Sequence, residues 1–302
     1  MTTTQPDLAH LLTLAVDAVG AGARLALDPG EALAVETKTD RNDVVTQVDR
    51  AVENLIAERL LGATGYPLLG EEGHSLPGEG GHSLPGVGGP AGVGGGDSVS
   101  ESGSDGAVRG PWAGRLWVLD PIDGTMNYVV TRRDWAISLA LCEDGEPVLA
   151  VVADPVAGHV YTALAGRGAL WDGRPMARVD GGRRGRPDGG ASFRDGVVIA
   201  GHKEVVALPR LSGVVEDSRG LRRYGAAALE MVEVAAGRAG AFVHLWLAPW
   251  DVAAAVLICR ECGVRVTRLD GTRMDVREKG SALVAAPRAH GELLARLVID
   301  AV

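Results

Sequence analysis

The chain has 302 residues, of which 46% are apolar, and it carries a net charge of -9 at pH 7. This apolar content is enough to bury one large domain or two smaller ones. The acidic balance excludes nucleic-acid binding through a broad positive surface, because neutralising phosphates requires clustered Lys and Arg.

The number and spacing of the cysteines indicate the redox compartment of the protein. Cys142, Cys259 and Cys262 are too few for a disulfide framework, which indicates a reducing compartment. Cys259 and Cys262 have the spacing of a metal motif, but no second Cys pair or neighbouring His completes a zinc set. We therefore expect them to pack as small apolar side chains.

We expect a cytoplasmic protein without a membrane partner. Residues 1–7 lack a charged start followed by an apolar run, so they do not resemble a secretory signal. No stretch approaches 18 uninterrupted apolar residues, which predicts that no segment spans a membrane.

Apolar residues recur at helical spacing in the first part of the chain. They predict an amphipathic helix over residues 8–23 and a second helix that begins near Thr46 and ends near Leu60. Thr46 and Asp49 have the spacing of an N-terminal capping arrangement. A purely structural role for Asp49 is therefore open at this point.

Residues 73–111 differ from the rest because Gly, Ser and Pro dominate. The segment 73–78 (GHSLPG) is repeated as 81–86. Such a composition buries too little apolar surface to offset its ordering entropy, so we expect a flexible insertion at about 74–111. The repeated His is weak evidence for metal binding. A second, shorter segment of this kind spans residues 180–191.

Short apolar stretches between Gly and Asp-Pro turns predict strands after the insertion. We expect strands at residues 116–119, 135–142, 147–153, 159–164, 196–200, 241–245, 264–267 and 282–286. We expect helices at residues 225–237, from 249 onward, and at 291–299. Strands and helices do not alternate strictly, which favours an α+β fold of layered sheets and helices over a doubly wound sheet.

The sequence DPIDGT follows the first of these strands. Asp120 ends the strand, and Pro121 favours a tight turn that brings back Asp123. Two close carboxylates repel each other unless a proton or a cation lies between them. Oxygen ligands without a thiolate suit Mg²⁺ or Mn²⁺. Gly124 leaves room for a ligand and Thr125 presents a hydroxyl, although an Asp-rich turn after a strand is an equally good interpretation.

Two further acids are ambiguous by themselves. Glu71 and Glu72 follow the apolar run 67–69, either at a strand end or on a solvated surface. Asp251 lies in the first turn of the helix that begins at Pro249, where the helix dipole favours a carboxylate in any protein.

In combination, these segments resemble the inositol monophosphatase family of metal-dependent phosphatases. The matching segments are 38–49 (KTDRNDVVTQVD), 70–72 (GEE), 120–127 (DPIDGTMN), 225–228 (GAAA) and 249–254 (PWDVAA). Their order and spacing fit over nearly the whole chain apart from the Gly-rich segments. The resemblance implies a layered αβαβα sandwich of the inositol monophosphatase and fructose-1,6-bisphosphatase type.

The resemblance also implies a division of the chain and a partner. An N-terminal α+β half, residues 1–172, would carry most metal ligands, and a C-terminal α/β half, residues 173–302, would supply Asp251 and substrate contacts. The family further implies a homodimer. The expected function is Mg²⁺-dependent hydrolysis of a phosphate monoester on a small metabolite, similar to inositol monophosphate, by an activated water.

Roles for individual residues follow from the resemblance alone. Two or three Mg²⁺ ions per site, or Mn²⁺, would be bound by Glu71, Asp120, Asp123, Asp251 and the carbonyl of Ile122. Asp120 would bridge two ions. The catalytic residues would be Glu71, Asp49 and Thr125, the last two positioning the attacking water. Substrate would contact Gly124, Thr125, Ala227, His202, His244 and Asp251.

His244 departs from the family pattern. Many inositol-specific members have a Glu there, seven residues before the Asp of the Trp-Asp motif. An imidazole cannot replace a carboxylate that accepts hydrogen bonds from a diol, so inositol preference is open. His202 follows a strand and could also face the substrate, and with Lys203 it could favour a more anionic ligand, such as one with a second phosphate. Alternative substrates are histidinol phosphate, a 3′-phosphoadenosine nucleotide or a sugar phosphate, and a non-catalytic regulatory protein with the same fold is an alternative class.

Overall fold

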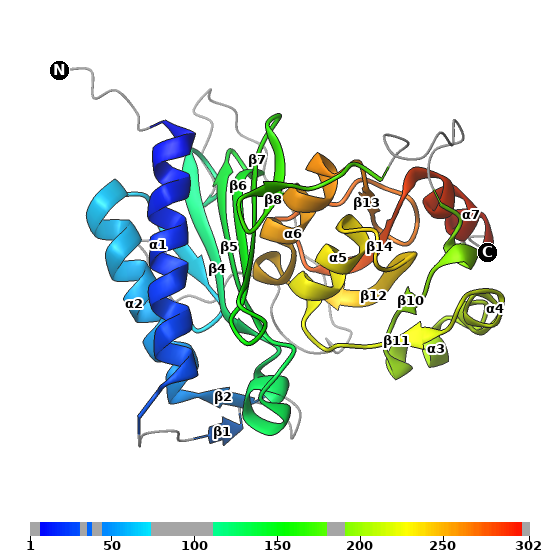
Figure 1. The fold of residues 1–302 in the computed structure, drawn as a ribbon, viewed down its shortest axis with the longest axis horizontal. Helices are drawn as coiled ribbons and strands as arrows, with labels where there is room; N and C mark the ends of the chain where they lie inside the picture. The colour runs from blue at the N-terminus through cyan, green and yellow to red at the C-terminus, as the bar shows by residue number, and fades with distance from the viewer. Residues whose placement is uncertain (1–6, 31–34, 38–43, 74–110, 180–190, 298–302) are drawn as a thin grey trace, which may run out of the picture.

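The computed structural model describes residues 7–30, 35–37, 44–73, 111–179 and 191–297. The expected insertion therefore lies outside the described residues except for Pro111, as do residues 180–190 of the second Gly-rich segment and residues 38–43. Within the described part, layers follow one another in the order helices, sheet, helices, sheet, helices (Figure 1). This is the expected αβαβα sandwich.

The first layer consists of α1 (Leu8–Leu27) and α2 (Gln47–Thr64), which pack on one face of the larger sheet. In the described residues this sheet has seven strands in the order β3-β4-β5-β6-β7-β8-β9. Their bounds are Leu68–Gly70, Arg115–Asp123, Ala136–Glu143, Glu146–Asp154, His159–Leu164, Gly168–Trp171 and Arg174–Pro175. Only the β3–β4 pair is parallel, and the other neighbours are antiparallel. A two-stranded ribbon, β1 (Val35–Thr37) and β2 (Val44–Thr46), precedes α2.

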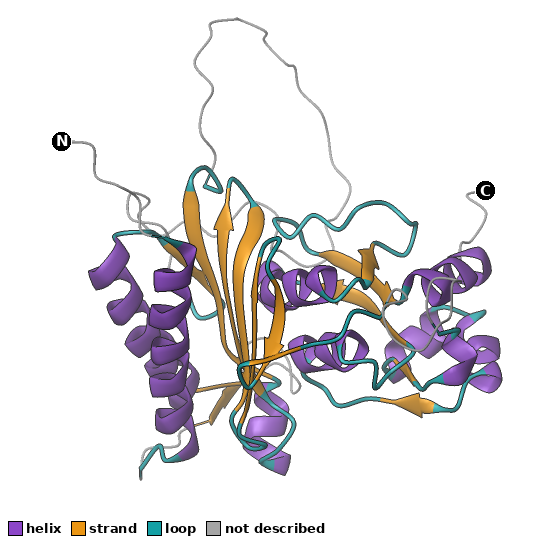
Figure 2. Ribbon diagram, turned by 45° about the horizontal axis from the view of Figure 1, so that its top comes forward, coloured by secondary structure: helices purple, strands orange, loops and turns teal. Residues whose placement is uncertain are grey.

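The middle layer separates the two sheets. It contains α5 (Ala227–Ala235) and α6 (Pro249–Glu261), and nearly all of α6 is buried. The described part of the second sheet has the strand order β11-β10-β12-β14-β13. These strands are Leu221–Arg222, Val198–Ile199, Ala241–Leu247, Gly280–Ala285 and Arg265–Thr267. The outer face is covered by α3 (His202–Ala207), α4 (Leu211–Asp217) and α7 (Pro287–Leu297) (Figure 2).

Helix α1 is long and apolar enough to cross a membrane by length and composition alone. The same test is passed by core helices, and α1 packs on α2 and on the face of the larger sheet. Its buried residues include Leu11, Ala15 and Val19. The core of the fold therefore accounts for its apolar face.

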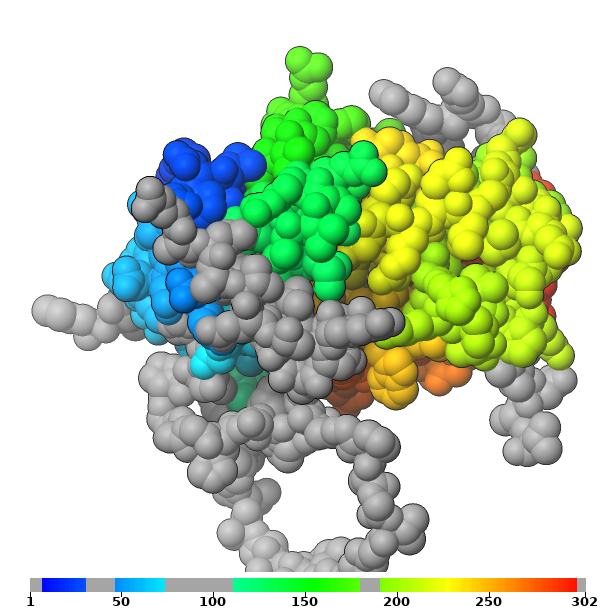
Figure 3. Space-filling view, turned by 90° about the horizontal axis from the view of Figure 1, so that it is seen from below, coloured from blue at the N-terminus to red at the C-terminus, as the bar shows by residue number. Residues whose placement is uncertain are grey.

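Most elements expected from the sequence are present, with shifted ends. The first strand after the insertion extends to Asp123 in β4, and the strand expected at 196–200 shortens to β10. The last helix begins at Pro287 rather than Gly291 because Pro is favoured in a first helical turn. The division at residue 172 stays a prediction, and the larger sheet continues through β9 to Pro175. Figure 3 shows the N-terminal and C-terminal parts packed against each other.

All three cysteines are free thiols and buried, which confirms the packing expected for Cys259 and Cys262. Burial raises the pKa of Cys142 to about 12 and that of Cys262 to about 11, and the pKa of Cys259 rises in the same direction. We predict that the folded protein does not react with a thiol reagent such as DTNB at about pH 8, because thiolate is the reactive form. In guanidinium chloride all three thiols should react. Rapid reaction of any thiol in the folded state would contradict this packing.

Candidate functional site

The DPIDGT segment lies at the end of β4, where the pairing with β5 becomes irregular between Asp120 and Asp123. Both acids are almost fully buried. Asp120 Oδ1 accepts a hydrogen bond from the N–H of Ile122 at 3.1 Å. The irregular backbone thus keeps two buried carboxyl groups close in sequence and space.

Asp123 connects β4 to the helix layer. Its Oδ1 accepts the N–H of Ala227 at 2.9 Å, and its Oδ2 accepts the N–H of Ala228 at 2.7 Å. These groups lie in the first turn of α5, where N–H groups have no partner within the helix. The N-cap residue, Ala226, has no side chain that could accept them. A carboxylate 104 positions earlier therefore caps α5.

Gly124 of the motif and Asn127, two residues after its end, pack against the segment that precedes α5. Gly124 has φ of +89°, and a Cβ atom there would lie 3.1 Å from the carbonyl oxygen of Gly225. Both the conformation and the close approach therefore require glycine. Asn127 Nδ2 donates to the carbonyl oxygens of Tyr224 and Asp134, each at 2.6 Å. Asn127 begins a short π-helical turn, η1 (Asn127–Thr131), a feature that is frequent at functional sites.

Thr125 and Asp49 form the pair that the sequence led us to expect. The Thr125 hydroxyl lies 3.1 Å from Asp49 Oδ1 and 3.1 Å from the carbonyl oxygen of Ile122. Asp49 is fully buried in the first turn of α2. Its side chain therefore reaches a loop 76 positions later and is not explained by local capping alone.

Glu71 joins the cluster through the parallel pairing of β3 with β4. Gly70 pairs with Leu119, and the N–H of Glu71 donates to the carbonyl oxygen of Leu119 at 3.3 Å. The Glu71 side chain is close enough to Asp120 for its carboxyl group to raise the pKa of Asp120.

The site concentrates negative charge away from water. Burial raises the pKa of Asp120 well above its usual value, and the charges of Glu71, Asp123 and Asp251 raise it further. Burial, followed by the charge of Asp251, also raises the pKa of Asp123. Burial raises the pKa of Asp251 to about 6, although its Oδ2 accepts the N–H of Ala248 at 2.7 Å. Three segments of the chain thus contribute acids that interact with Asp120.

The donor chemistry of this cluster fits a hard divalent cation. Every side chain in it offers only carboxylate oxygens, which Mg²⁺ and Mn²⁺ prefer, and mutual repulsion favours a cation between them. Within the described ranges, no three His, Cys, Asp or Glu side chains already stand at the separations of a formed metal site. The carboxylates of Asp123 and Asp251 are instead turned toward backbone N–H groups.

The residues expected to contact substrate lie in different environments. The N–H of Ala227 is used by Asp123. His202 is exposed at the start of α3. His244 on β12 is mostly buried, stacks on Phe242, and has its Nε2 3.9 Å from Glu204 Oε1. His244 therefore packs against neighbours from its own strand and from α3.

Sequence reasoning missed three buried glutamates that hold backbone turns. Glu53 accepts the N–H of Glu72 at 2.9 Å. Glu204 accepts those of Gly201 and Leu245, at 3.0 and 3.3 Å, and Glu230 accepts those of Tyr224 and Gly225, at 2.6 and 2.8 Å. The available signal was an acid on the apolar face of a helix, because a buried carboxylate requires such partners.

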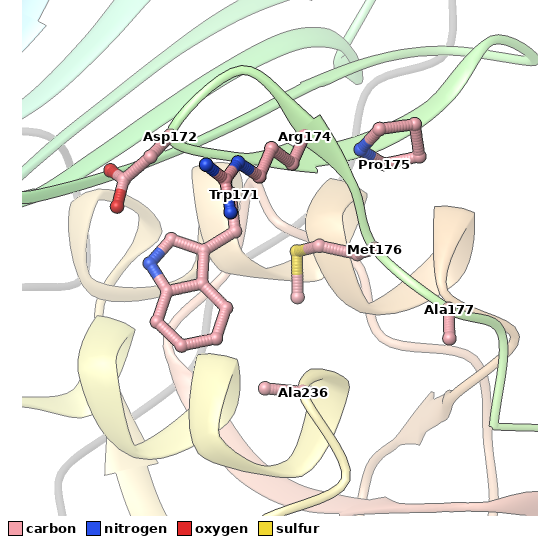
Figure 4. Close-up of a pocket in the computed structure, with 7 residues that line it drawn as sticks. All are labelled: Trp171, Asp172, Arg174, Pro175, Met176, Ala177 and Ala236. Atoms are coloured by element: carbon pink, nitrogen blue, oxygen red, sulfur yellow. The ribbon is translucent and has the colours of Figure 1, made fainter.

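A cavity of about 530 Å³ lies elsewhere, between the β8–β9 hairpin and the end of α5 (Figure 4). Its lining is made of Trp171, Asp172, Arg174, Pro175, Met176, Ala177 and Ala236. None of the clustered acids lines it, so this cavity is separate from the candidate site.

Comparisons with known proteins identify the family of the chain. Residues 7–301 match the model of the inositol monophosphatase family. The chain is 33% identical over 276 residues to an inositol-1-monophosphatase of Bacillus subtilis, covering 89% of each chain. It is 33% identical over 260 residues to Nus factor SuhB of Pseudomonas aeruginosa, covering 84% of this chain and 83% of the relative. A solved structure of inositol monophosphate-bound SaIMPase-II superimposes with a TM-score of 0.72 at 26% identity, covering 95% of this chain and 93% of the other.

We predict that Asp120→Asn stabilises the metal-free protein at about pH 7.5, because it removes one charge from the cluster. Raised pKa values mean that the folded state binds more protons than the unfolded state. The contribution of these acids to the stability of the metal-free wild type should therefore be fully present near pH 4 and be lost as the pH rises through about 6, the pKa of Asp251. The melting temperature, measured in chelator against pH, should fall less steeply in the variant.

Asp270→Asn is the matched control for this measurement. Hydrogen bonds from Thr272 lower the pKa of Asp270, so losing its charge should bring no gain. Identical pH slopes for wild type and Asp120→Asn would show that Asp120 carries no such repulsion.

Proposed function

Because the chain belongs to the inositol monophosphatase family and is a phosphoric monoester hydrolase, we propose that it is a Mg²⁺-dependent phosphatase of a small phosphorylated metabolite. The observation that carries the proposal is the burial of Asp120 beside Glu71, Asp123 and Asp251. A folded protein tolerates such a cluster at neutral pH when a proton or a cation balances it.

We propose Glu71, Asp120, Asp123, Asp251 and the carbonyl of Ile122 as the cation ligands. Two or three Mg²⁺ ions, or Mn²⁺, would supply the positive charge that activates water and stabilises the leaving oxygen. Asp123 and Asp251 each accept backbone N–H groups. These hydrogen bonds would orient the two carboxylates, as hydrogen bonds to metal-binding side chains commonly do.

Thr125 and Asp49 are the proposed groups that position the attacking water. The Thr125 hydroxyl lies within hydrogen-bond distance of Asp49 Oδ1. When it donates to the buried Asp49 carboxylate, its oxygen lone pairs are directed at a neighbouring donor, here a water molecule. The same water can then lose a proton toward this pair as it attacks phosphorus.

The phosphate would lie on the backbone around Gly124 and Thr125, in keeping with the family resemblance. The rest of the substrate would extend toward His202 and His244. Burial lowers the pKa of His244, an effect that nearby Lys203 and Arg223 strengthen and that Glu204 opposes. A neutral imidazole there is a poor partner for a diol, which argues against a strict inositol preference. The substrate is proposed as inositol monophosphate-like on the family resemblance, with histidinol phosphate, a 3′-phosphoadenosine nucleotide or a sugar phosphate as alternatives.

The relative named Nus factor SuhB supports a second candidate, a regulatory protein that retains the fold. The presence of Asp49, Glu71, Asp120, Thr125 and Asp251 favours turnover, because a protein without turnover has no need of the whole set. We further propose a cytoplasmic homodimer, in keeping with the family resemblance.

Phosphate release from a panel of phosphorylated metabolites is predicted to require Mg²⁺. EDTA should abolish it, excess Mg²⁺ should restore it, and lithium should inhibit it, as the family resemblance implies. Asp120→Asn should lower kcat by several orders of magnitude, because water activation and charge stabilisation are lost together. Full activity in chelator, or near-normal kcat in the variant, would refute the metal assignment.

His244→Glu is predicted to raise kcat/KM for inositol monophosphate relative to other monoesters. A charged hydrogen bond contributes roughly 1.5–3 kcal/mol, which corresponds to a change in preference of about ten- to a hundredfold. Because the new carboxylate would lie close to Glu204, the variant should also be measured with Glu204→Gln. Unchanged substrate ratios in both backgrounds, with metal affinity intact, would reject a specificity role for His244.

A further inference from the structure

Glu53 is a charged residue in a place where the helix pattern calls for an apolar one. It lies on α2 between Val52 and Ile56, which are fully buried, and is itself only 1% exposed. A carboxylate taken out of water is costly unless it is hydrogen-bonded. The fold must therefore gain something from this side chain that an apolar residue would not provide.

The partner of Glu53 is the turn that carries Glu71. Glu53 Oε2 accepts the N–H of Glu72 at 2.9 Å, and the carboxylate lies against Gly70, the last residue of β3. A Cβ atom at Gly70 would collide with the Glu53 carboxylate. The turn is thus held on both sides of Glu71, by a hydrogen bond after it and by close packing before it.

Asp49 and Glu53 are four residues apart, so they lie on one face of α2. Asp49 reaches the hydroxyl of Thr125 after β4, and Glu53 reaches the backbone after β3. One rigid helix therefore sets the relative position of two loops that come from neighbouring strands. From this arrangement we propose that Glu53 is a positioning residue, which fixes Glu71 beside Asp120 for cation binding.

This inference rests on the proposed function, since Glu71 is a proposed ligand. A purely structural role for Glu53 is the alternative, and it makes a different prediction. A structural carboxylate changes the stability of the fold when it is removed, whereas a positioning carboxylate also changes cation affinity. Mutation of a residue that orients a metal ligand typically lowers metal affinity by about 10–100-fold.

Direct Mn²⁺ binding to the full chain, followed by electron paramagnetic resonance of the free ion, tests the proposal without relying on turnover. Glu53→Ala should weaken Mn²⁺ binding by about 10–100-fold. Glu53→Gln keeps an oxygen that can accept the Glu72 N–H, so this variant should retain most of the Mn²⁺ affinity of the wild type. Gly70→Ala should weaken binding by displacing the carboxylate while leaving Glu53 in place.

Two variants on the same helix serve as controls. Val52→Ala creates a cavity beside Glu53 and should lower the melting temperature without changing Mn²⁺ affinity. Glu58→Ala removes an exposed acid and should change neither. The Mg²⁺ concentration for half-maximal phosphatase activity should follow the Mn²⁺ affinities across the series.

The outcomes separate this inference from the proposed function. If the wild type binds Mn²⁺ and Glu53→Ala, Gly70→Ala and Val52→Ala all bind it equally well, Glu53 is structural and the inference is wrong. If the wild type itself binds no Mn²⁺ and hydrolyses no monoester with Mg²⁺, the proposed function fails and the inference fails with it. Should Glu53→Ala not fold, Gly70→Ala decides the question by the same measurement, since it is expected to weaken Mn²⁺ binding only if Glu53 positions Glu71.

Discussion

The hydrogen bonds from the first turn of α5 to Asp123 are the contact on which the site depends. They join the end of β4, in the larger sheet, to a helix in the layer between the sheets. The N-cap residue of α5 is alanine, so the helix end relies on a carboxylate from a distant part of the chain. Asn127 strengthens the same junction through its hydrogen bond to Tyr224. The two parts of the chain therefore meet through the residues of the DPIDGT motif and its extension.

Buried carboxylates in this protein fall into two groups by their partners. Glu53, Glu204 and Glu230 accept backbone N–H groups from turns near the site, which offsets their removal from water. Asp120 accepts the N–H of Ile122 but also lies beside other carboxyl groups, whose charges raise its pKa. The backbone hydrogen bonds of the first group hold the loops in place. The repulsion between Asp120 and its neighbouring carboxyl groups would be relieved by a positive charge. Asp123 belongs to both groups, because it caps a helix and also faces Asp251.

Glu53, Glu204 and Glu230 hold the backbone near the site by hydrogen bonds. Each accepts backbone N–H groups next to a residue near the site: after Glu71, after His244 where the pairing of β12 becomes irregular, and at Gly225 before α5. A hydrogen bond to a charged acceptor contributes about 1.5–3 kcal/mol, more than a neutral one. Such anchors restrict backbone motion at the places where a substrate and cations would have to be held in register.

The sequence by itself determined the elements and the chemistry of the site. Periodicity gave α1 and α2, the DPIDGT turn indicated paired acids, and the spacing of five motifs identified the family. Only the tertiary structure decided the partners: which helix Asp123 caps, which loop Asp49 reaches, and why Glu53 is buried. These contacts join residues far apart in the chain, and a pattern in one segment carries no information about the segment that folds against it. The same limit applies to His244, whose mostly buried place beside Glu204 follows from sheet packing.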